Sequence, residues 1–411
     1  MRLLWSCLLG LLLWCYGGVT APALAMTDAQ RLVVEVWHIV NRAYVDPTFN
    51  GHNWQQVRRA ALQRPLETMA QARQVIQEML VQLDDPFTRL LPRQQYRTLQ
   101  TTTAGTLTGV GLQLVLDGEQ RVPLVVAPIP GSPAARAGIQ SHDRIVAIDG
   151  QPTQGLDMET AASRLRGAPG TPVTLTLQRG EQQWTVTLER QRVILPSVVW
   201  EVRPGDIGYI QLSQFSASSA AEMARAIQAL EAQGVRGYVL DLRNNPGGLF
   251  QAGIEIAQEW IDQGTVVYTV NRDGEQTDFT AAGQALTDKP LVVLINHGTA
   301  SASEILAGAL QDHHRAWLVG EPTFGKGLIQ SVFPLSNGDG LAVSVARYQT
   351  PAHHDIHRRG ITPDQLVPTP AEGITDPARD PQYQAAVAWL ERYLAQGSPS
   401  ILETEQRGWH G

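Results

Sequence analysis

Cysteine and lysine are scarce in this sequence. Its only two cysteines, Cys7 and Cys15, lie in an apolar N-terminal stretch. A chain without that stretch has no thiol, which excludes disulfides, a cysteine nucleophile and thiolate metal ligands. Among 32 basic residues only Lys289 and Lys326 are lysines, and all the others are arginines. Arginine does not release its proton, whereas lysine can, so each of these two lysines is checked below as a possible base.

A basic excess is also lacking. The 32 basic and 39 acidic side chains give a formal net charge of −7, and a chain without a basic field is a poor partner for a phosphate backbone. We therefore expect no nucleic-acid binding. With 411 residues, 43% of them hydrophobic, the chain can bury a core and is too long for one ordinary domain.

Long apolar runs are absent after the N-terminus. Residues 3–16 form an apolar stretch behind Arg2, and Ala23-Leu24-Ala25 supplies the small-x-small pattern that a signal peptidase cuts. The stretch is shorter than the ~20 residues that a membrane-spanning helix needs. We predict a signal peptide over residues 1–25 and an exported protein that begins at Met26. An uncleaved stretch that anchors the chain is the alternative.

The spacing of apolar residues predicts helices within residues 26–100. One apolar stripe runs from Leu32 to Tyr44 and a second from Ala72 to Leu83, and a proline follows each of them closely. Spacings of three and four residues place each stripe on one helix face, and proline ends a helix. Such stripes are packing faces far more often than cofactor sites, so we expect a small helical domain.

Residues 101–192 carry short β-type runs at 111–116, 123–127, 144–148 and 173–177, with glycine and proline turns between them and a short helix at 161–165. The segment Gly109-Val110-Gly111-Leu112 and the run 130–150, which matches a helix, a turn and a strand, resemble a PDZ domain. The resemblance implies that the loop of Gly109, Val110, Gly111 and Leu112 binds a terminal carboxylate through backbone N–H groups, beside a strand edge that accepts an extended peptide. Taken alone, such a glycine pair is more often a tight turn, and it is the surrounding PDZ-like module that favours the binding loop.

After residue 192 strands and helices alternate. Strands are expected at 209–212, 237–242 and 291–295, with helices between them and after them, and a hairpin at 329–333 and 341–346 turns through Asn337-Gly338. Ser219 and Glu222 have the spacing of a capping box. This pattern predicts an α/β layer over residues 193–370, with functional loops beyond the carboxyl ends of its strands. A helical segment is expected at 371–411.

The loop after the strand at 291–295 carries Ser301 and Ser303. N–H groups at a helix start have no partner within the helix and lie at the positive end of its dipole, which suits an oxyanion. Both serines are therefore candidates for a nucleophile. A serine before a helix is far more often an N-cap, and its position alone does not decide between these interpretations.

Lys326 lies between Gly325 and Gly327, which allow the backbone to pack closely around the amine. Lysine has an ordinary pKa near ~10.4, so a lysine base at pH 7 needs its pKa lowered by roughly three units, and burial in a dry site can do this. Lys289, between Asp288 and Pro290, is interpreted as a solvated turn residue.

Histidine is the competing base. His297 precedes Ser301 by four residues, and the loop 353–357 contains three histidines and an aspartate. Two of those histidines have an i, i+4 spacing that can bind a metal, but Pro351 disfavours a helix and no HExxH motif is present. We therefore predict no metal and no cofactor. A G-x-S-x-G elbow is also missing.

Three segments resemble the carboxyl-terminal processing peptidases, or tail-specific proteases: 240–248 (Leu-Asp-Leu-Arg-Asn-Asn-Pro-Gly-Gly), 299–304 (Thr-Ala-Ser-Ala-Ser-Glu) and 321–330 (Glu-Pro-Thr-Phe-Gly-Lys-Gly-Leu-Ile-Gln). With the PDZ-like module, the resemblance covers nearly all of the mature chain. It implies a multidomain α+β protein with a helical N-terminal domain, a PDZ domain and a crotonase-like α/β catalytic domain.

The same resemblance implies a serine–lysine dyad. It assigns the nucleophile to Ser301, the base to Lys326 and a lysine-holding role to Gln330, with the backbone N–H groups of Gly247 and Ala302 as the oxyanion hole. The expected activity is that of an exported serine endopeptidase. Its PDZ domain would bind the carboxyl terminus of a protein, and its dyad would cleave near that end through an acyl-enzyme.

Segments 50–54, 83–89 and 347–356 are most similar to the photosynthetic branch of the family, whose members trim the carboxyl-terminal extension of a photosystem II reaction-centre subunit. This similarity implies a monomer in the periplasm or thylakoid lumen that acts on protein substrates with free carboxyl termini, close to the membrane through its substrate. Two other classes stay open: a non-catalytic peptide-binding factor, and a Ser-His-Asp protease with a PDZ domain. The strand-to-helix serine and the missing G-D-S-G site disfavour the second.

Overall fold

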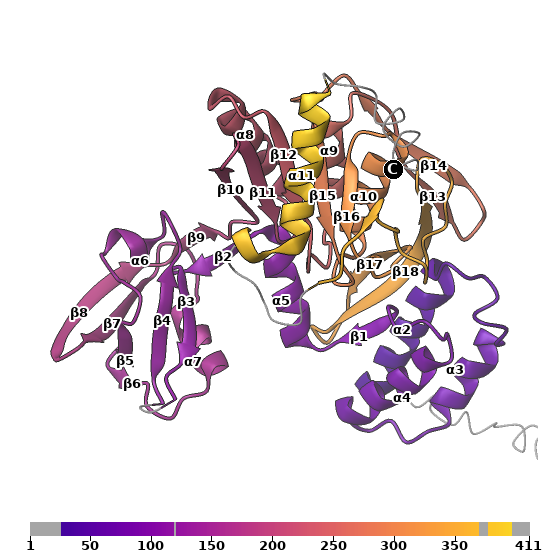
Figure 1. Ribbon diagram of the computed structural model, residues 1–411. Coiled ribbons are helices and arrows are strands. Elements are labelled where there is room, and N and C mark those ends of the chain that lie inside the picture. The colour runs from indigo at the N-terminus through magenta and orange to yellow at the C-terminus, as the bar shows by residue number, and fades with distance from the viewer. Residues whose placement is uncertain (1–25, 119–120, 370–376, 397–411) are drawn as a thin grey trace, which may run out of the picture. The chain divides into compact units, whose positions relative to one another are not determined.

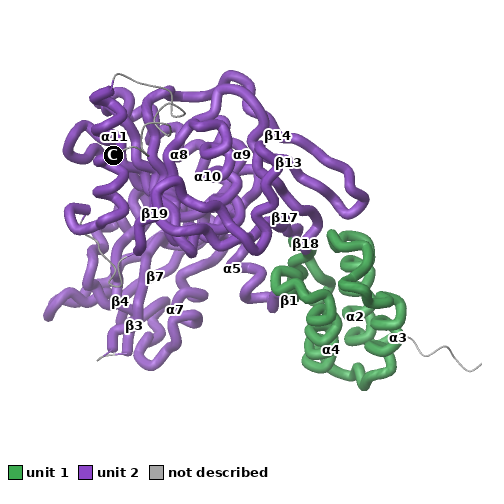
Figure 2. The backbone as a smooth tube through the Cα atoms, turned by 45° about the vertical axis from the view of Figure 1, so that its right-hand side comes forward, with its two compact units in different colours: residues 1–90, 332–343 green, residues 91–331, 344–411 purple. Residues whose placement is uncertain are grey.

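The computed structural model describes residues 26–118, 121–369 and 377–396 of the chain. The chain divides into two compact units: Met1–Leu90 with Val332–Val343, and Leu91–Ser331 with Ser344–Gly411 (Figure 2). The predicted signal peptide, residues 1–25, lies outside the described residues. Within the described ranges, no helix is both long and apolar enough to cross a membrane.

Helices make up the body of the first unit: α2 (Asp28–Ala43), α3 (Trp54–Leu62) and α4 (Met69–Val81). Thr27 caps α2 in a capping box, because its hydroxyl accepts the Gln30 N–H while the Gln30 side chain accepts the Thr27 N–H. The predicted apolar stripes are the buried faces of α2 and α4. The short strand β1 (Arg89–Leu91) follows. The predicted helical N-terminal region is confirmed.

The second segment of this unit, Val332–Val343, is the tip of a hairpin from later in the chain. The side chain of Asp339 is fully buried there and accepts two hydrogen bonds from the Arg73 guanidinium, at 2.8 and 3.0 Å. The hydroxyl of Ser336 donates to Glu35 at 2.6 Å. Because Arg73 lies on α4 and Glu35 on α2, both helices hold the hairpin tip.

The second unit begins with α5 (Arg93–Ala104), so the predicted boundary at residue 100 falls inside a helix. Strand β2 (Thr106–Gly109) then pairs with β9 (Gln191–Ile194), and the residues between them form a small sheet of order β3-β4-β5-β7-β8, with β6 beside β5. Its elements are β3 (Leu112–Leu116), β4 (Pro123–Pro128), α6 (Pro133–Arg136), β5 (Arg144–Ile148), β6 (Gln151–Pro152), α7 (Met158–Leu165), β7 (Pro172–Arg179) and β8 (Gln182–Glu189).

An α/β layer follows, with the strand order β10-β11-β12-β15-β16-β19 (Figure 1). Strand β10 is antiparallel to β11, and the strands from β11 to β19 are parallel. The strands are β10 (Val198–Arg203), β11 (Ile207–Leu212), β12 (Gly237–Asp241), β15 (Leu291–Ile295), β16 (Trp317–Gly320) and β19 (Gln365–Leu366).

Helices cover both faces of this sheet. Side chains at alternate strand positions point to opposite faces. Leu240 and Val293 pack with α8 (Ser219–Ala232), α9 (Phe250–Trp260) and α10 (Ala302–Asp312). Val239 and Val292 pack with α11 (Pro381–Ala395), which follows the short helix η1 (Pro377–Arg379) and lies within the predicted C-terminal helical segment.

A second sheet in this part of the chain has the order β18-β13-β14, with β17 paired to β18. It consists of β13 (Gln263–Asn271), β14 (Gln276–Ala282), β17 (Leu328–Pro334) and β18 (Gly340–Gln349). The hairpin predicted from 329–333 and 341–346 is the pair β17 and β18. The first sheet brings the ends of β12, β15 and β16 to one edge, because these neighbouring strands are parallel.

Candidate active site

Ser301 lies in the turn between β15 and α10, directly before the first helical residue. Its backbone has φ 58° and ψ −117°, a conformation that L-residues other than glycine rarely adopt. Two hydrogen bonds fix the turn just before Ser301: the Thr299 hydroxyl donates to the Leu242 carbonyl at 2.9 Å, and the Ala300 N–H donates to the Asn245 carbonyl at 3.0 Å. A strained backbone that its neighbours hold in place is common at catalytic positions.

The second candidate nucleophile, Ser303, has another role. It is fully buried, and its hydroxyl donates to the Asn245 carbonyl at 3.0 Å. Ser301 is only partly buried, so a substrate can reach it. Of the two serines, Ser303 fastens the loop after β12 to α10, and Ser301 is the more accessible one.

Glu304 connects the serine and the lysine. Its side chain is fully buried, and its Oε2 accepts the N–H of Ser301 at 2.8 Å and the N–H of Lys326 at 2.9 Å. Its Oε1 accepts the Gly325 N–H at 2.7 Å and the Thr323 hydroxyl at 2.6 Å. One carboxylate thus ties the loop after β16 to the start of α10, and its charge is compensated by four donors.

Lys326 is in the loop between β16 and β17. Its Nζ donates to Oε1 of Gln330 at 2.7 Å. The flanking glycines pack as tightly as predicted: a Cβ on Gly325 would lie 2.9 Å from the Arg359 nitrogen, and one on Gly327 would lie 2.8 Å from the His357 nitrogen. The sequence therefore keeps glycine on both sides of the lysine because the backbone from 357 to 360 is in contact with this loop.

The predicted oxyanion-hole residues lie beside Ser301. A Cβ on Gly247 would approach the Ser301 Cβ to 2.8 Å and the Ala302 nitrogen to 2.9 Å, and the φ of Gly247 is 92°. Ala302 is the first residue of α10, where the helix provides no acceptor for the N–H group. The Gly247 N–H donates to Oδ1 of Asn245 at 2.9 Å, so an oxyanion would share or replace that acceptor.

Arg243, to which the sequence analysis assigned no role, holds the start of the Gly247 loop. Its guanidinium binds Asp241 on β12, with contacts down to 2.6 Å, and Asp380 at the start of α11, at 2.7 Å. Burial disfavours the charge, but the hydrogen bonds and charges of Asp241 and Asp380 outweigh it and raise the pKa of Arg243. This ion pair network only forms in the fold, since Asp380 lies far along the chain.

Within the described residues, the histidines are not arranged as a metal site. His297 is exposed, and its ring has no hydrogen-bond partner among the described residues. In the loop 353–357, the His353 ring stacks on Tyr268 with centroids 4.2 Å apart, while His354 lies 3.7 Å from Asp312. Over the described ranges, no group of three or more histidine, cysteine, aspartate or glutamate side chains is placed to hold a metal ion.

Lys289 is not simply solvated, as its turn position suggested. Its Nζ lies 2.6 Å from the Glu231 carboxylate, and both side chains are only 30% exposed. The bond anchors the entrance of β15 to the end of α8. Lys289 is therefore a structural ion pair partner.

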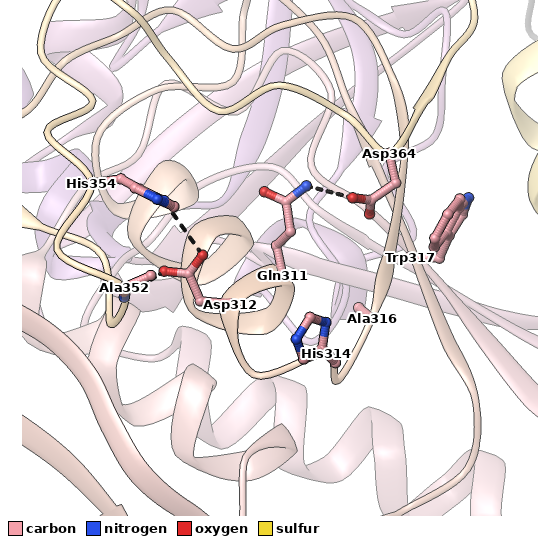
Figure 3. Close-up of a pocket in the computed structure, with 8 residues that line it drawn as sticks. All are labelled: Gln311, Asp312, His314, Ala316, Trp317, Ala352, His354 and Asp364. Atoms are coloured by element: carbon pink, nitrogen blue, oxygen red, sulfur yellow. Dashed lines mark hydrogen bonds and ion pairs between the residues drawn. The ribbon is translucent and has the colours of Figure 1, made fainter. Parts of the chain in front are cut away.

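A pocket of about 330 Å³ lies at the opposite end of α10 from Ser301. Figure 3 shows the side chains of Gln311 and Asp312 reaching Asp364 and His354 across it. It is lined by Gln311, Asp312, His314, Ala316, Trp317, Ala352, His354 and Asp364. None of these residues is in the predicted site, so the pocket has no part in the chemistry around Ser301.

The predicted peptide-binding loop joins β2 to β3. Val110 is buried in the core of the small sheet. Gly111 has φ 77°, and a Cβ there would lie 2.2 Å from the Ser132 Cβ. Its carbonyl accepts the Ile129 N–H at 2.9 Å. Glycine is thus required at 111 by the packing of α6 against the loop, and Gly109 and Leu112 end β2 and begin β3.

Comparisons with known proteins agree with this architecture. The model of peptidase family S41 matches residues 206–367, and that of the PDZ domain matches residues 124–179. A carboxyl-terminal-processing protease of Synechocystis is 54% identical and covers 94% of this chain and 92% of its own length. A protease of the same description from Picosynechococcus is 51% identical, with 93% and 94% covered.

A solved structure described as a photosystem II D1 C-terminal processing protease is 41% identical, with a TM-score of 0.54, and the match covers 84% of this chain and 94% of that one. The chloroplastic carboxyl-terminal-processing peptidase 2 of Arabidopsis thaliana is 43% identical over 84% of this chain and 70% of its own length. The predicted fold class, a helical N-terminal region, a PDZ domain and an α/β catalytic domain, is confirmed.

Proposed function

The chain belongs to peptidase family S41, and within it to the carboxyl-terminal processing proteases, so it is a serine peptidase; we propose that Ser301 is its nucleophile and Lys326 its general base. The observation that carries this proposal is the bridge made by Glu304, whose Oε2 accepts the backbone N–H of both residues. The bridge holds two loops from neighbouring parallel strands together at the start of α10, where N–H groups face outward.

The proposed reaction has two steps. Neutral Lys326 takes the proton of the Ser301 hydroxyl while Oγ attacks the peptide carbonyl carbon, and the N–H groups of Gly247 and Ala302 stabilise the oxyanion. The C–N bond then breaks, and the leaving amine takes the proton from Lys326. A water molecule attacks the acyl-enzyme, with Lys326 as base again, and releases the new carboxyl terminus. Gln330 orients the amine through its 2.7 Å hydrogen bond.

The substrate is proposed to be a protein with a free carboxyl terminus. The loop of Gly109, Val110, Gly111 and Leu112 would bind the terminal carboxylate, and an extended peptide would pair along the strand edge, as in PDZ domains. The similarity to carboxyl-terminal-processing proteases favours carboxyl-terminal processing, and the similarity to a photosystem II D1 processing protease favours a photosystem II subunit as substrate. We therefore propose export to the periplasm or thylakoid lumen and action, as a monomer, near the membrane that holds the substrate.

The dyad is tested with residues 26–411 and an extended peptide that has a free carboxyl terminus. Ser301→Ala, Lys326→Ala and Lys326→Arg are expected to fold, as judged by circular dichroism, and to lose turnover by at least about 1,000-fold. Lys289→Arg is the matched control and should keep full turnover, since its ion pair with Glu231 tolerates either cation. Normal turnover by Lys326→Arg would show that a group that cannot deprotonate is sufficient, and would exclude a lysine base.

The histidine alternative is tested in the same assay. His297→Ala should keep turnover within about twofold of the wild type, because the exposed ring contacts no group of the site. A folded His297→Ala chain without activity would instead favour a Ser-His mechanism. Inactivity of the wild type itself toward every peptide would favour a non-catalytic peptide-binding factor.

A further inference from the structure

Tyr348 is a buried tyrosine that the reaction scheme above does not use. It lies on β18 opposite Thr269 of β13, and only 1% of it is exposed. Its ring belongs to the apolar core between the sheet and helices α8, α9 and α10. Its backbone N–H donates to the Gly327 carbonyl at 3.1 Å, directly after Lys326. The residue is thus attached to the lysine loop through its main chain.

Its hydroxyl makes the more specific contacts. The oxygen lies 2.7 Å from the Lys326 carbonyl and 3.1 Å from the Ser301 carbonyl. A phenol has one proton, so the two carbonyls share one donor. Burial and the nearby charge of Glu304 raise the pKa of Tyr348 well above its ordinary value, which keeps the hydroxyl protonated and able to donate.

Glu304 and Tyr348 therefore act on the same two residues from opposite sides. The carboxylate accepts the N–H of Ser301 and of Lys326, and the phenol donates to the C=O of each. The two loops that carry Ser301 and Lys326 come from different strands, and the Phe324 N–H also joins them by donating to the Thr299 carbonyl at 3.0 Å. A residue that binds both carbonyls limits how far the two loops can separate.

We propose that Tyr348 is a positioning residue that fixes Lys326 relative to Ser301 by hydrogen bonding to the carbonyl oxygens of both. This inference rests on the proposed Ser301 and Lys326 dyad. Tyr348 is not a catalytic residue, because its hydroxyl faces backbone carbonyls. The Ser301 carbonyl also accepts the N–H groups of Glu304 and Ile305 in the first turn of α10, at 2.8 and 3.0 Å. Loss of the phenol should therefore disturb the position of the Lys326 loop more than that of the Ser301 turn.

The test compares Tyr348→Phe with Tyr238→Phe in residues 26–411. Tyr238 is a matched control, since it is also fully buried and its hydroxyl donates to Glu231 at 2.8 Å, away from the site. We expect Tyr348→Phe to lower kcat by about 10- to 100-fold, because a small misplacement of a base has a large effect, with KM within about twofold of the wild type. Tyr238→Phe should leave kcat unchanged.

Hydrogen exchange gives a readout separate from turnover. Peptides that cover residues 322–328 should exchange faster in Tyr348→Phe and not in Tyr238→Phe. Site-specific 3-fluorotyrosine at position 348, which keeps the donor, should restore both turnover and protection.

Several results would overturn the proposal. A kcat of Tyr348→Phe within twofold of the wild type would do so, and so would an equal loss of kcat in Tyr238→Phe. Unchanged hydrogen exchange of residues 322–328 in Tyr348→Phe would do so as well. A Tyr348→Phe chain that does not fold, while Tyr238→Phe does, would make the tyrosine purely structural. Failure of the dyad itself is seen separately, as retained turnover in Ser301→Ala or Lys326→Arg. An inactive Lys326→Arg beside a fully active Tyr348→Phe leaves the dyad in place and removes only the positioning role.

Discussion

Gly247 is the residue at which backbone geometry limits the site most directly. A Cβ there would collide with the Ala300 carbonyl at 2.6 Å and with Ser301 at 2.8 Å, and its φ is 92°. We predict that Gly247→Ala moves the Ser301 turn and lowers kcat by about 100-fold or more, the size of effect seen when an oxyanion donor is lost. Peptide cleavage by the purified variant measures the loss.

Gly234→Ala is the control for Gly247→Ala. Gly234 also has a positive φ, 72°, but its Cβ would meet nothing within 4 Å. Both substitutions bring roughly 1 kcal/mol of backbone strain, so both should lower Tm slightly, and only Gly247→Ala should lower kcat. Gly247→Ala with more than a third of wild-type turnover would show that the contact at Ser301 does not matter.

Glu259, near the end of α9, predicts a pH dependence of stability. Burial, with a smaller contribution from the charge of Glu255, raises its pKa to about 9. Its Oε2 is buried and has no hydrogen-bond partner among the described residues. The unfolded chain has a glutamate pKa near ~4.3, so between these values the folded state binds more protons. The free energy of unfolding therefore falls as pH rises, by up to about 1 kcal/mol per pH unit.

The measurement is chemical unfolding of wild type and Glu259→Gln from pH 5 to pH 9. The wild type should lose stability with increasing pH, and Glu259→Gln should lose less, because its amide cannot ionise. Glu181→Gln, at an exposed turn position, serves as the control and should follow the wild type. Parallel curves for Glu259→Gln and the wild type would mean that the carboxyl ionises normally in the folded protein.

At the residue scale, the scarcity of lysine and the family resemblance led to the proposed pair of Ser301 and Lys326 and to Gln330 beside the lysine. The sequence did not predict the other residues that contact both members of the pair. The bonds of Glu304 and Tyr348 to both of them depend on how loops after β15 and β16 meet. No spacing along the chain encodes that meeting, so these contacts became visible only in three dimensions.

At the element scale, buried strands were predicted best. The strand at 291–295 has the predicted bounds, because five consecutive aliphatic residues are typical of a parallel strand that helices cover on both faces. Strands β13 and β14 were not predicted. Strand β14 buries only Ala281 and so has a weak apolar pattern, whereas the apolar run 266–270 of β13 was a signal that the sequence analysis missed.

The predicted capping box at Ser219 was wrong. Ser219 lies inside α8, where its hydroxyl accepts the Ser216 N–H at 2.7 Å. The Glu222 carboxylate instead accepts the N–H groups of Ser197 and Val198, at 2.7 and 3.1 Å, before and at the start of β10. Glu222 therefore accepts hydrogen bonds from residues far away in the sequence and does not cap its own helix.

The start of α11 connects an element on one face of the sheet to the Gly247 loop. Asp380 caps α11 by accepting the N–H groups of Gln382 and Tyr383, and it also binds Arg243 at 2.7 Å with only 9% of its side chain exposed. We predict that Asp380→Ala lowers the free energy of unfolding by about 2–4 kcal/mol. It should also lower kcat, because Arg243 begins the loop that carries Gly247.

Asp157→Ala is the control that separates the effect of losing a helix cap from the effect of losing the ion pair with Arg243. Asp157 caps α7 by accepting the Thr160 N–H at 2.7 Å and contacts no arginine in the described structure. Its loss should lower the stability less than Asp380→Ala does and leave kcat unchanged. Urea unfolding and peptide cleavage measure both quantities, and equal effects of the two variants on kcat would argue against a role of α11 in the site.

At the scale of the whole molecule, the β17 and β18 hairpin belongs to both compact units. Its tip, Val332–Val343, is part of the N-terminal helical unit, while Gln330 and Tyr348 on the same two strands contact Lys326. The N-terminal helices therefore hold the far end of the strands that bear two contacts of the proposed base.

Arg73→Met tests this dependence. Arg73 binds Asp339, whose side chain is fully buried, so the substitution removes the cation from a buried carboxylate. Because 42% of the arginine side chain is exposed, we expect a moderate loss of about 1–3 kcal/mol and a Tm lowered by roughly 5 °C. Loosening of the hairpin should also lower kcat several-fold at temperatures where the chain stays folded.

Arg64→Met is the matched control. It removes an arginine from the same helical unit, but the Arg64 and Glu78 side chains are 49% and 46% exposed, and such surface pairs contribute at most about 1 kcal/mol. Its Tm and kcat should stay near those of the wild type. If Arg73→Met lowered Tm without any change in kcat, the helical unit would stabilise the hairpin tip only, and Gln330 and Tyr348 would be held by the catalytic domain alone.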